Sequence, residues 1–129
     1  MTRSPPSLLP HIDGIEILHV RRMSIHGPPI EECRGAPCFQ ISGGDAQLIA
    51  SLWRELPEGE QMRCHIPPFL YRFYHEGVSV QEASVCWRCN NIFGITGGQK
   101  WVFEFDSSHT ASQRLLTETR RVTGIVAEG

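Results

Sequence analysis

The sequence lacks long apolar runs and long blocks of like charge, and each absence excludes a class of protein. No stretch approaches the roughly 20 apolar residues that a membrane-spanning helix needs, so we expect no membrane association. The formal net charge of −2 comes from mixed signs, so nucleic-acid binding through bulk electrostatics is not expected. Prolines within residues 1–10 stand where a signal peptide would have its apolar run, which predicts a cytoplasmic protein.

Cysteine is sparse, and its number is odd. The chain has five cysteines and no recognisable export signal. This combination predicts a reducing compartment in which thiols stay free or bind metal, and disulfides are the less expected state.

The length of 129 residues is usual for one domain. Residues 1–14 contain prolines and show no periodicity, which predicts a flexible leader that contributes nothing to the core. We expect a single domain over residues 15–124 and a tail over residues 125–129.

Two segments have helical character. Apolar residues recur at helical spacing between Asp45, the expected cap, and Pro57, the expected stop, with Trp53 on the buried side. A second helix should follow the cap residues of segment 106–108 and end near Gly124.

Strands are expected near residues 15–23 and 37–42, and alternation predicts a hairpin formed by residues 69–74 and 78–87. In the expected register Arg72 lies opposite Glu82, and the aromatic residues of the first strand share one face with Ala83 and Val85. Residues 91–95 extend the chain to a second turn at 96–99, and residues 101–105 complete a three-stranded meander. The predicted fold is α+β, with an antiparallel sheet of about five strands and two helices.

The hairpin register has a chemical consequence. It places Cys64 opposite residues 87–91, and therefore near Cys89 and the C-x-x-C formed by Cys86 and Cys89. Three sulfurs could hold zinc with His65 as a fourth ligand, although His109, Cys33 and Cys38 are alternatives.

Two other readings of the cysteines stay open. In a thiol-redox protein, one cysteine of the C-x-x-C attacks and the other resolves a mixed disulfide, but Asn90 and Asn91 continue as strand and do not open a helix. The third reading is that the thiols are inert and buried, as free cysteines commonly are.

No combination of nucleophile, base and oxyanion donors emerges, so an enzyme is less expected than a binding protein. Cys64 and His65 are adjacent, and neighbours on a strand point to opposite faces. The polar run from Asp106 to His109 fits helix capping better than hydrolysis.

The segments Cys64-His-Ile-Pro67 and Val85-Cys-Trp-Arg-Cys89 carry a family likeness. Together with the hairpin between them, they make the chain resemble a loose group of small uncharacterised bacterial proteins with C-x-x-P, a β-hairpin and a C-x-x-C. Pro68 departs from this pattern, in which a basic residue is expected. The resemblance implies a bacterial source and a shared scaffold, without an activity.

The leading expectation is a bacterial, non-enzymatic protein-binding domain, immunity-like or regulatory, in which the cysteine trio supports the sheet. Its expected partner is another protein, and residues 27–32 are the candidate contact segment. The alternative is a zinc-binding or thiol-redox protein that uses Cys64, Cys86 and Cys89.

Overall fold

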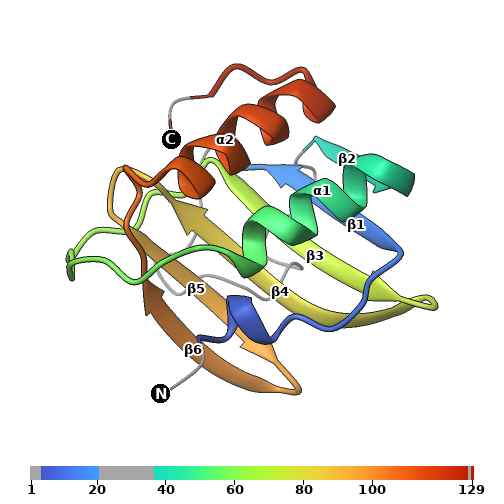
Figure 1. Ribbon diagram of the computed structural model, residues 1–129, viewed down its shortest axis with the longest axis horizontal. Helices are drawn as coiled ribbons and strands as arrows, with labels where there is room; N and C mark the ends of the chain where they lie inside the picture. Colours follow the sequence, from blue (N-terminus) through green and yellow to red (C-terminus); the bar gives the residue numbers. More distant parts are fainter. Residues whose placement is uncertain (1–3, 21–36, 128) are drawn as a thin grey trace.

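The computed structural model describes residues 4–20, 37–127 and 129, and it has the expected α+β class. Six strands form one antiparallel sheet in the order β2-β1-β3-β4-β5-β6 (Figure 1). The strands are β1 (Gly14–His19), β2 (Cys38–Ser42), β3 (Phe69–His75), β4 (Val78–Cys86), β5 (Asn91–Thr96) and β6 (Gln99–Glu104). The helices are α1 (Gly43–Arg54), α2 (Thr110–Thr123) and the short 3₁₀ helix η1 (Pro6–Leu8).

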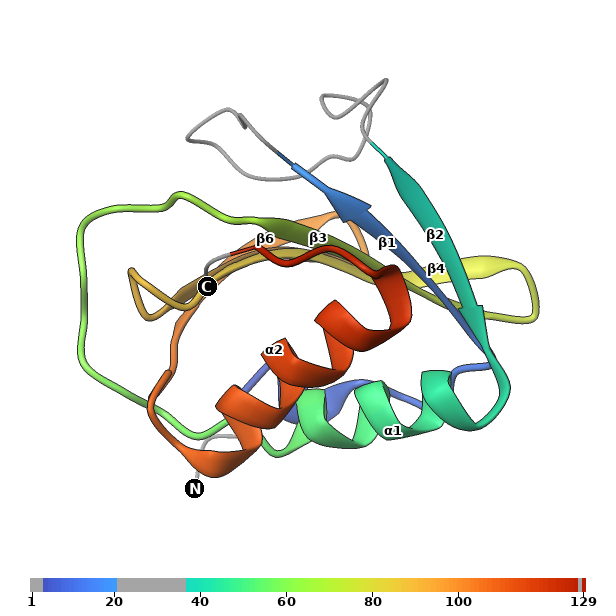
Figure 2. The same ribbon diagram turned by 90° about the horizontal axis from the view of Figure 1, so that it is seen from above.

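Both α-helices cover the same face of the curved sheet and lie side by side (Figures 1 and 2). The space between the helices and the sheet is filled by apolar side chains, including the fully buried Trp53 of α1 and Tyr71 and Phe73 of β3. Trp53 is thus a core residue, as its helical spacing predicts. No helix in the described ranges is long and apolar enough to cross a membrane.

The hairpin of β3 and β4 has the predicted register. Arg72 pairs with Glu82, and Tyr71 pairs with Ala83 on the face beneath the helices. The turn uses Glu76 and Gly77, whose φ angles of 49° and 80° are left-handed. Glycine at the second position makes this tight reversal inexpensive. The alternation of apolar and polar residues was therefore sufficient to align the two strands.

The sheet has one strand more than the expected count of about five. Residues 91–95 were expected only to extend the chain, but they form β5, which pairs with β4 on one side and β6 on the other. The chain reverses between Cys86 and Asn91, and Asn90 takes a left-handed conformation with φ 55° there. The meander consequently has four strands.

The expectation that residues 1–14 contribute nothing to the core is wrong for the described part of this segment. Leu9 and Ile12 are buried in the core. Side chains of α1 hold the segment, because Arg54 donates hydrogen bonds to the carbonyl oxygens of Leu9 and Pro10, and Gln47 donates to that of Ile12. The packed unit therefore begins before Ile15.

The helices start at residues other than the expected caps. Ser42 is the cap of α1, and the carboxylate of Asp45 instead accepts a hydrogen bond from Arg121 of α2 at 2.7 Å. At α2 the cap is His109, whose Nδ1 accepts from the amide of Ala111, while Asp106 accepts from Ser108. The end of α2 is as predicted, because Gly124 takes the left-handed conformation there.

Candidate thiol site

The C-x-x-C forms the turn between β4 and β5. Cys86 ends β4 and pairs with Asn91, the first residue of β5. Between them, Trp87 packs toward the helices and donates its indole N–H to the carbonyl oxygen of Ser112 at 2.8 Å. Asn90 is held by the residue that follows β6, because its carbonyl oxygen accepts from the amide of Phe105 at 2.9 Å. The turn is therefore fixed on two sides, which holds both of its cysteines in place.

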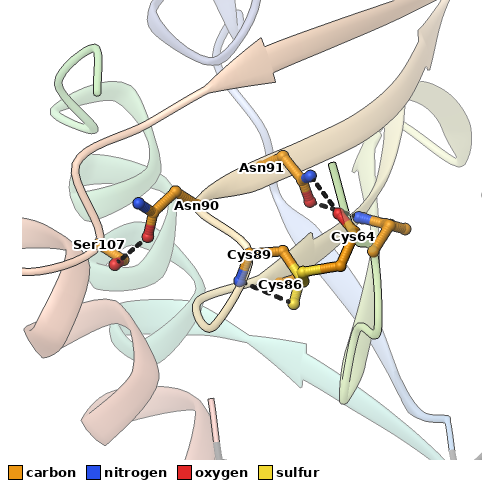
Figure 3. The surroundings of a disulfide bond; sticks show 7 residues. Cys64, Cys86, Cys89, Asn90, Asn91 and Ser107 are labelled. Carbon is orange, nitrogen blue, oxygen red and sulfur yellow. Dashed lines mark hydrogen bonds between the residues drawn. A yellow bond between two sulfur atoms is a disulfide. The ribbon is translucent and has the colours of Figure 1, made fainter. Parts of the chain in front are cut away.

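Cys64 and Cys89 form a disulfide, with their Cα atoms 5.4 Å apart (Figure 3). The third cysteine, Cys86, is a free thiol, and its sulfur accepts a hydrogen bond from the amide of Cys89 at 3.2 Å. The predicted convergence of the three cysteines is thus confirmed. The preference for free thiols is wrong for Cys64 and Cys89, because the hairpin register brings their Cα atoms within the range that a disulfide requires.

The three cysteines differ in their access to solvent. Cys86 and Cys89 have no exposed surface, whereas Cys64 is an exposed residue of the connection between α1 and β3. Figure 2 shows this connection leaving the helix layer and passing around to the sheet. The disulfide therefore joins a surface residue to a fully buried one.

Hydrogen bonds fasten the Cys64 loop to the sheet face that the helices leave uncovered. Asn91 donates its side-chain N–H to the carbonyl oxygen of Cys64 at 2.5 Å (Figure 3). The Asn91 Oδ1 atom lies 2.6 Å from Nδ1 of His65, and Ser84 Oγ lies 2.7 Å from His65 Nε2. Since Oδ1 can only accept, Nδ1 carries a proton. Nε2 accepts from the Ser84 hydroxyl when the ring is neutral and would donate to the same oxygen in the protonated ring.

His65 is half-buried and stacks on Phe93, with ring centroids 3.7 Å apart. Burial lowers the pKa of His65, and the hydrogen bond with Asn91 only partly opposes this effect. Low solvent access favours the neutral ring, in which Nδ1 donates to Asn91 and Nε2 accepts from Ser84. His65 therefore serves here as a structural bridge with both ring nitrogens occupied.

The predicted zinc ligands do not form a set in the disulfide state. Two of the three sulfurs are bonded to each other, and His65 has no free ring nitrogen. Within the described ranges, no three His, Cys, Asp or Glu side chains are arranged to hold a metal ion. His109 is occupied as the α2 cap, Cys38 lies exposed on β2, and Cys33 falls outside the described residues.

The sequence pattern did not single out Ser84 and Asn91 as parts of the site. Both are polar and buried, with exposed fractions of 0% and 2%. The sequence contains one signal for Asn91. It is a polar residue that follows Cys89 and Asn90, at a position where the expected strand did not require a polar side chain. The candidate contact segment 27–32 lies outside the described residues.

No protein-family model, curated protein or solved structure matches this chain. The resemblance to small bacterial proteins stays a prediction, and the function is inferred from the chain's own residues.

Proposed function

We propose that this protein carries out thiol–disulfide exchange with cysteines of another protein. The observation that supports this function most is the disulfide between exposed Cys64 and buried Cys89, with the free Cys86 thiol beside it. Exchange needs a sulfur that a partner can reach and a second sulfur that can displace the partner. Cys64 is the exposed residue of the bonded pair, and Cys89 is the cysteine within bonding distance of it.

In the oxidising half-reaction the partner supplies a disulfide. The Cys64 thiolate attacks one partner sulfur, a mixed disulfide forms, and the other partner sulfur leaves as a thiolate. The Cys89 thiolate then attacks the Cys64 sulfur, which releases the second partner thiolate and forms the Cys64–Cys89 bond. The protein loses two electrons and the partner gains two. With a partner dithiol the same steps run in reverse.

The surroundings suit this role. The turn that carries Cys89 is held by Trp87 and Asn90, and the loop that carries Cys64 is held by hydrogen bonds that do not involve sulfur. Because none of these contacts uses a sulfur atom of the disulfide, we expect the two cysteines to stay close in the reduced protein. A short distance between the reduced thiols favours fast reformation of the bond.

A trapping experiment tests the assignment of roles. With a disulfide-containing probe such as oxidised glutathione, the reduced Cys89→Ser variant should accumulate a mixed disulfide on Cys64. In the Cys64→Ser variant the buried Cys89 should accumulate none, and adding Cys38→Ser, which removes an exposed thiol elsewhere, should change neither result at Cys64 or Cys89. Intact mass and peptide mapping provide the readout.

Two results would contradict the proposal. One is a protein, purified without reductant, in which peptide mapping finds Cys64, Cys86 and Cys89 all as free thiols. The other is stoichiometric zinc that is lost in Cys86→Ser, which would support the metal-binding alternative. The non-enzymatic protein-binding function stays a prediction.

A further inference from the structure

Cys86 has no part in the exchange just described, yet its position is specific. Its thiol is fully buried, and the amide of Cys89 donates to its sulfur at 3.2 Å. Figure 3 shows the Cys86 sulfur beside the disulfide. Cys89 is therefore flanked by two cysteines, of which Cys64 is exposed and Cys86 is not.

We infer that the disulfide moves between two positions, Cys64–Cys89 and Cys86–Cys89, and that Cys86 is the thiol that moves it. This inference rests on the proposed exchange function. The Cys86 thiolate attacks the Cys89 sulfur, the Cys86–Cys89 bond forms, and the Cys64–Cys89 bond breaks. The electron pair leaves on the Cys64 sulfur, and the proton lost by Cys86 is returned to Cys64 through solvent. No oxidant or reductant is consumed.

The fold permits both bonds. The C-x-x-C spacing across a tight turn is compatible with a disulfide between its two cysteines, as in thiol oxidoreductases. The Cys64 loop is also held by contacts other than its covalent link, because Asn91 donates to the Cys64 carbonyl oxygen and His65 bonds to Asn91 and Ser84. Moving the disulfide therefore leaves Cys64 in place.

The functional consequence concerns the partner. With the bond at Cys86–Cys89, the oxidised protein keeps an exposed Cys64 thiol, which can form a mixed disulfide with a further cysteine-containing partner. The stored disulfide then joins two residues with no exposed surface, so external thiols reach it less readily. Cys86 thus separates storage of the disulfide from contact with the partner.

Alkylation kinetics test the inference. The full chain is prepared with Cys33→Ser and Cys38→Ser, so that only the trio remains, and the matched variant carries Cys86→Ala in addition. Both are oxidised, freed of small molecules and treated with iodoacetamide under native conditions. In the parent, Cys64 should be alkylated, whereas in the variant, whose Cys64 stays in the Cys64–Cys89 disulfide, this alkylation should be lost. Mapping of the alkylated parent should find a Cys86–Cys89 disulfide.

The outcomes are distinguishable. Equally slow alkylation of Cys64 in both proteins would show that the disulfide does not move to Cys86–Cys89. Alkylation of Cys86 in a parent protein whose Cys64–Cys89 bond is intact would show the same. An oxidised parent with no disulfide within the trio overturns the exchange function as well. If Cys86→Ala does not fold, the alkylated parent alone still decides the question, because peptide mapping shows whether its disulfide is Cys86–Cys89 or Cys64–Cys89.

Discussion

The two faces of the sheet are held in different ways. On the face beneath the helices, Trp53 packs against Tyr71 and Phe73, with ring centroids 5.4 and 4.9 Å apart. On the other face, where β4 ends and β5 begins, the Cys64 loop is held by a disulfide and by hydrogen bonds of His65. The first face relies on apolar area, and the second relies on bonds between particular atoms.

Because of this difference, the two faces should respond differently to the redox state and the pH of the solution. Apolar burial is non-directional and does not depend on the redox state of the solution. A disulfide opens on reduction, and protonation of the half-buried His65 would turn its Nε2 from an acceptor into a donor toward Ser84. The uncovered face can therefore change with conditions while the helical face maintains the fold.

The largest effect is expected from Trp53→Ala, which opens a cavity beneath the helices. It should lower the free energy of unfolding by about 3–5 kcal/mol. Urea denaturation should give the same loss with and without reductant. The control Trp53→Phe keeps most of the volume but removes the hydrogen bond to buried Gln81, and it should cost about 1–3 kcal/mol. A loss that depends on reductant would show that the two faces are not separate.

Removal of the disulfide is expected to have the next largest effect. The bond closes a loop with a sequence separation of 25 residues, for which the entropy of loop closure suggests about 3 kcal/mol. Cys64→Ser should show this loss in non-reducing urea titrations, and reduction of the parent should reproduce it. Cys38→Ser, outside the trio, should leave the unfolding free energy unchanged. An unchanged midpoint in Cys64→Ser would mean that the Cys64–Cys89 bond adds nothing to the stability of the folded protein.

A smaller loss is expected at the ion pair on the uncovered face. Arg72 Nε lies 3.0 Å from Glu82 Oε1, and both side chains are about one-fifth exposed, at 19% and 18%. Arg72→Met should cost about 1–2 kcal/mol, because Glu82 keeps its burial and loses its partner. Adding Glu82→Gln should recover part of the loss. If the two substitutions have additive costs in a double-mutant cycle, the pair contributes no coupling.

Much of this arrangement was accessible from sequence, and the reasons are local. Alternation along residues 69–87 defines a buried face, which fixes the Arg72–Glu82 register and with it the proximity of Cys64 and Cys89. The turn at 87–90 was missed because its reversal depends on the left-handed Asn90, which no periodicity records.

The other differences from expectation depend on tertiary contacts. Leu9 and Ile12 are packed by virtue of side chains from α1, far along the chain. The environment of His65 exists only because the Cys64 loop returns over β4 and β5. Free thiols were expected because the sequence lacks an export signal. The disulfide instead follows from the short distance between the Cα atoms of Cys64 and Cys89.

The smallest predicted effect is the pH dependence that His65 adds to stability. Burial lowers the pKa of His65 in the folded protein, whereas the unfolded chain titrates near the ordinary value of about 6.5. As the pH falls through 6.5 the unfolded state takes up the proton first, so stability declines until the pH passes the folded pKa. His65→Gln cannot titrate and retains donor and acceptor atoms, so its unfolding free energy should fall less between pH 7.5 and 5.5. Phe93→Ala, which exposes the ring, should give an intermediate slope. Equal slopes in the parent and His65→Gln would exclude His65 as a source of the pH response.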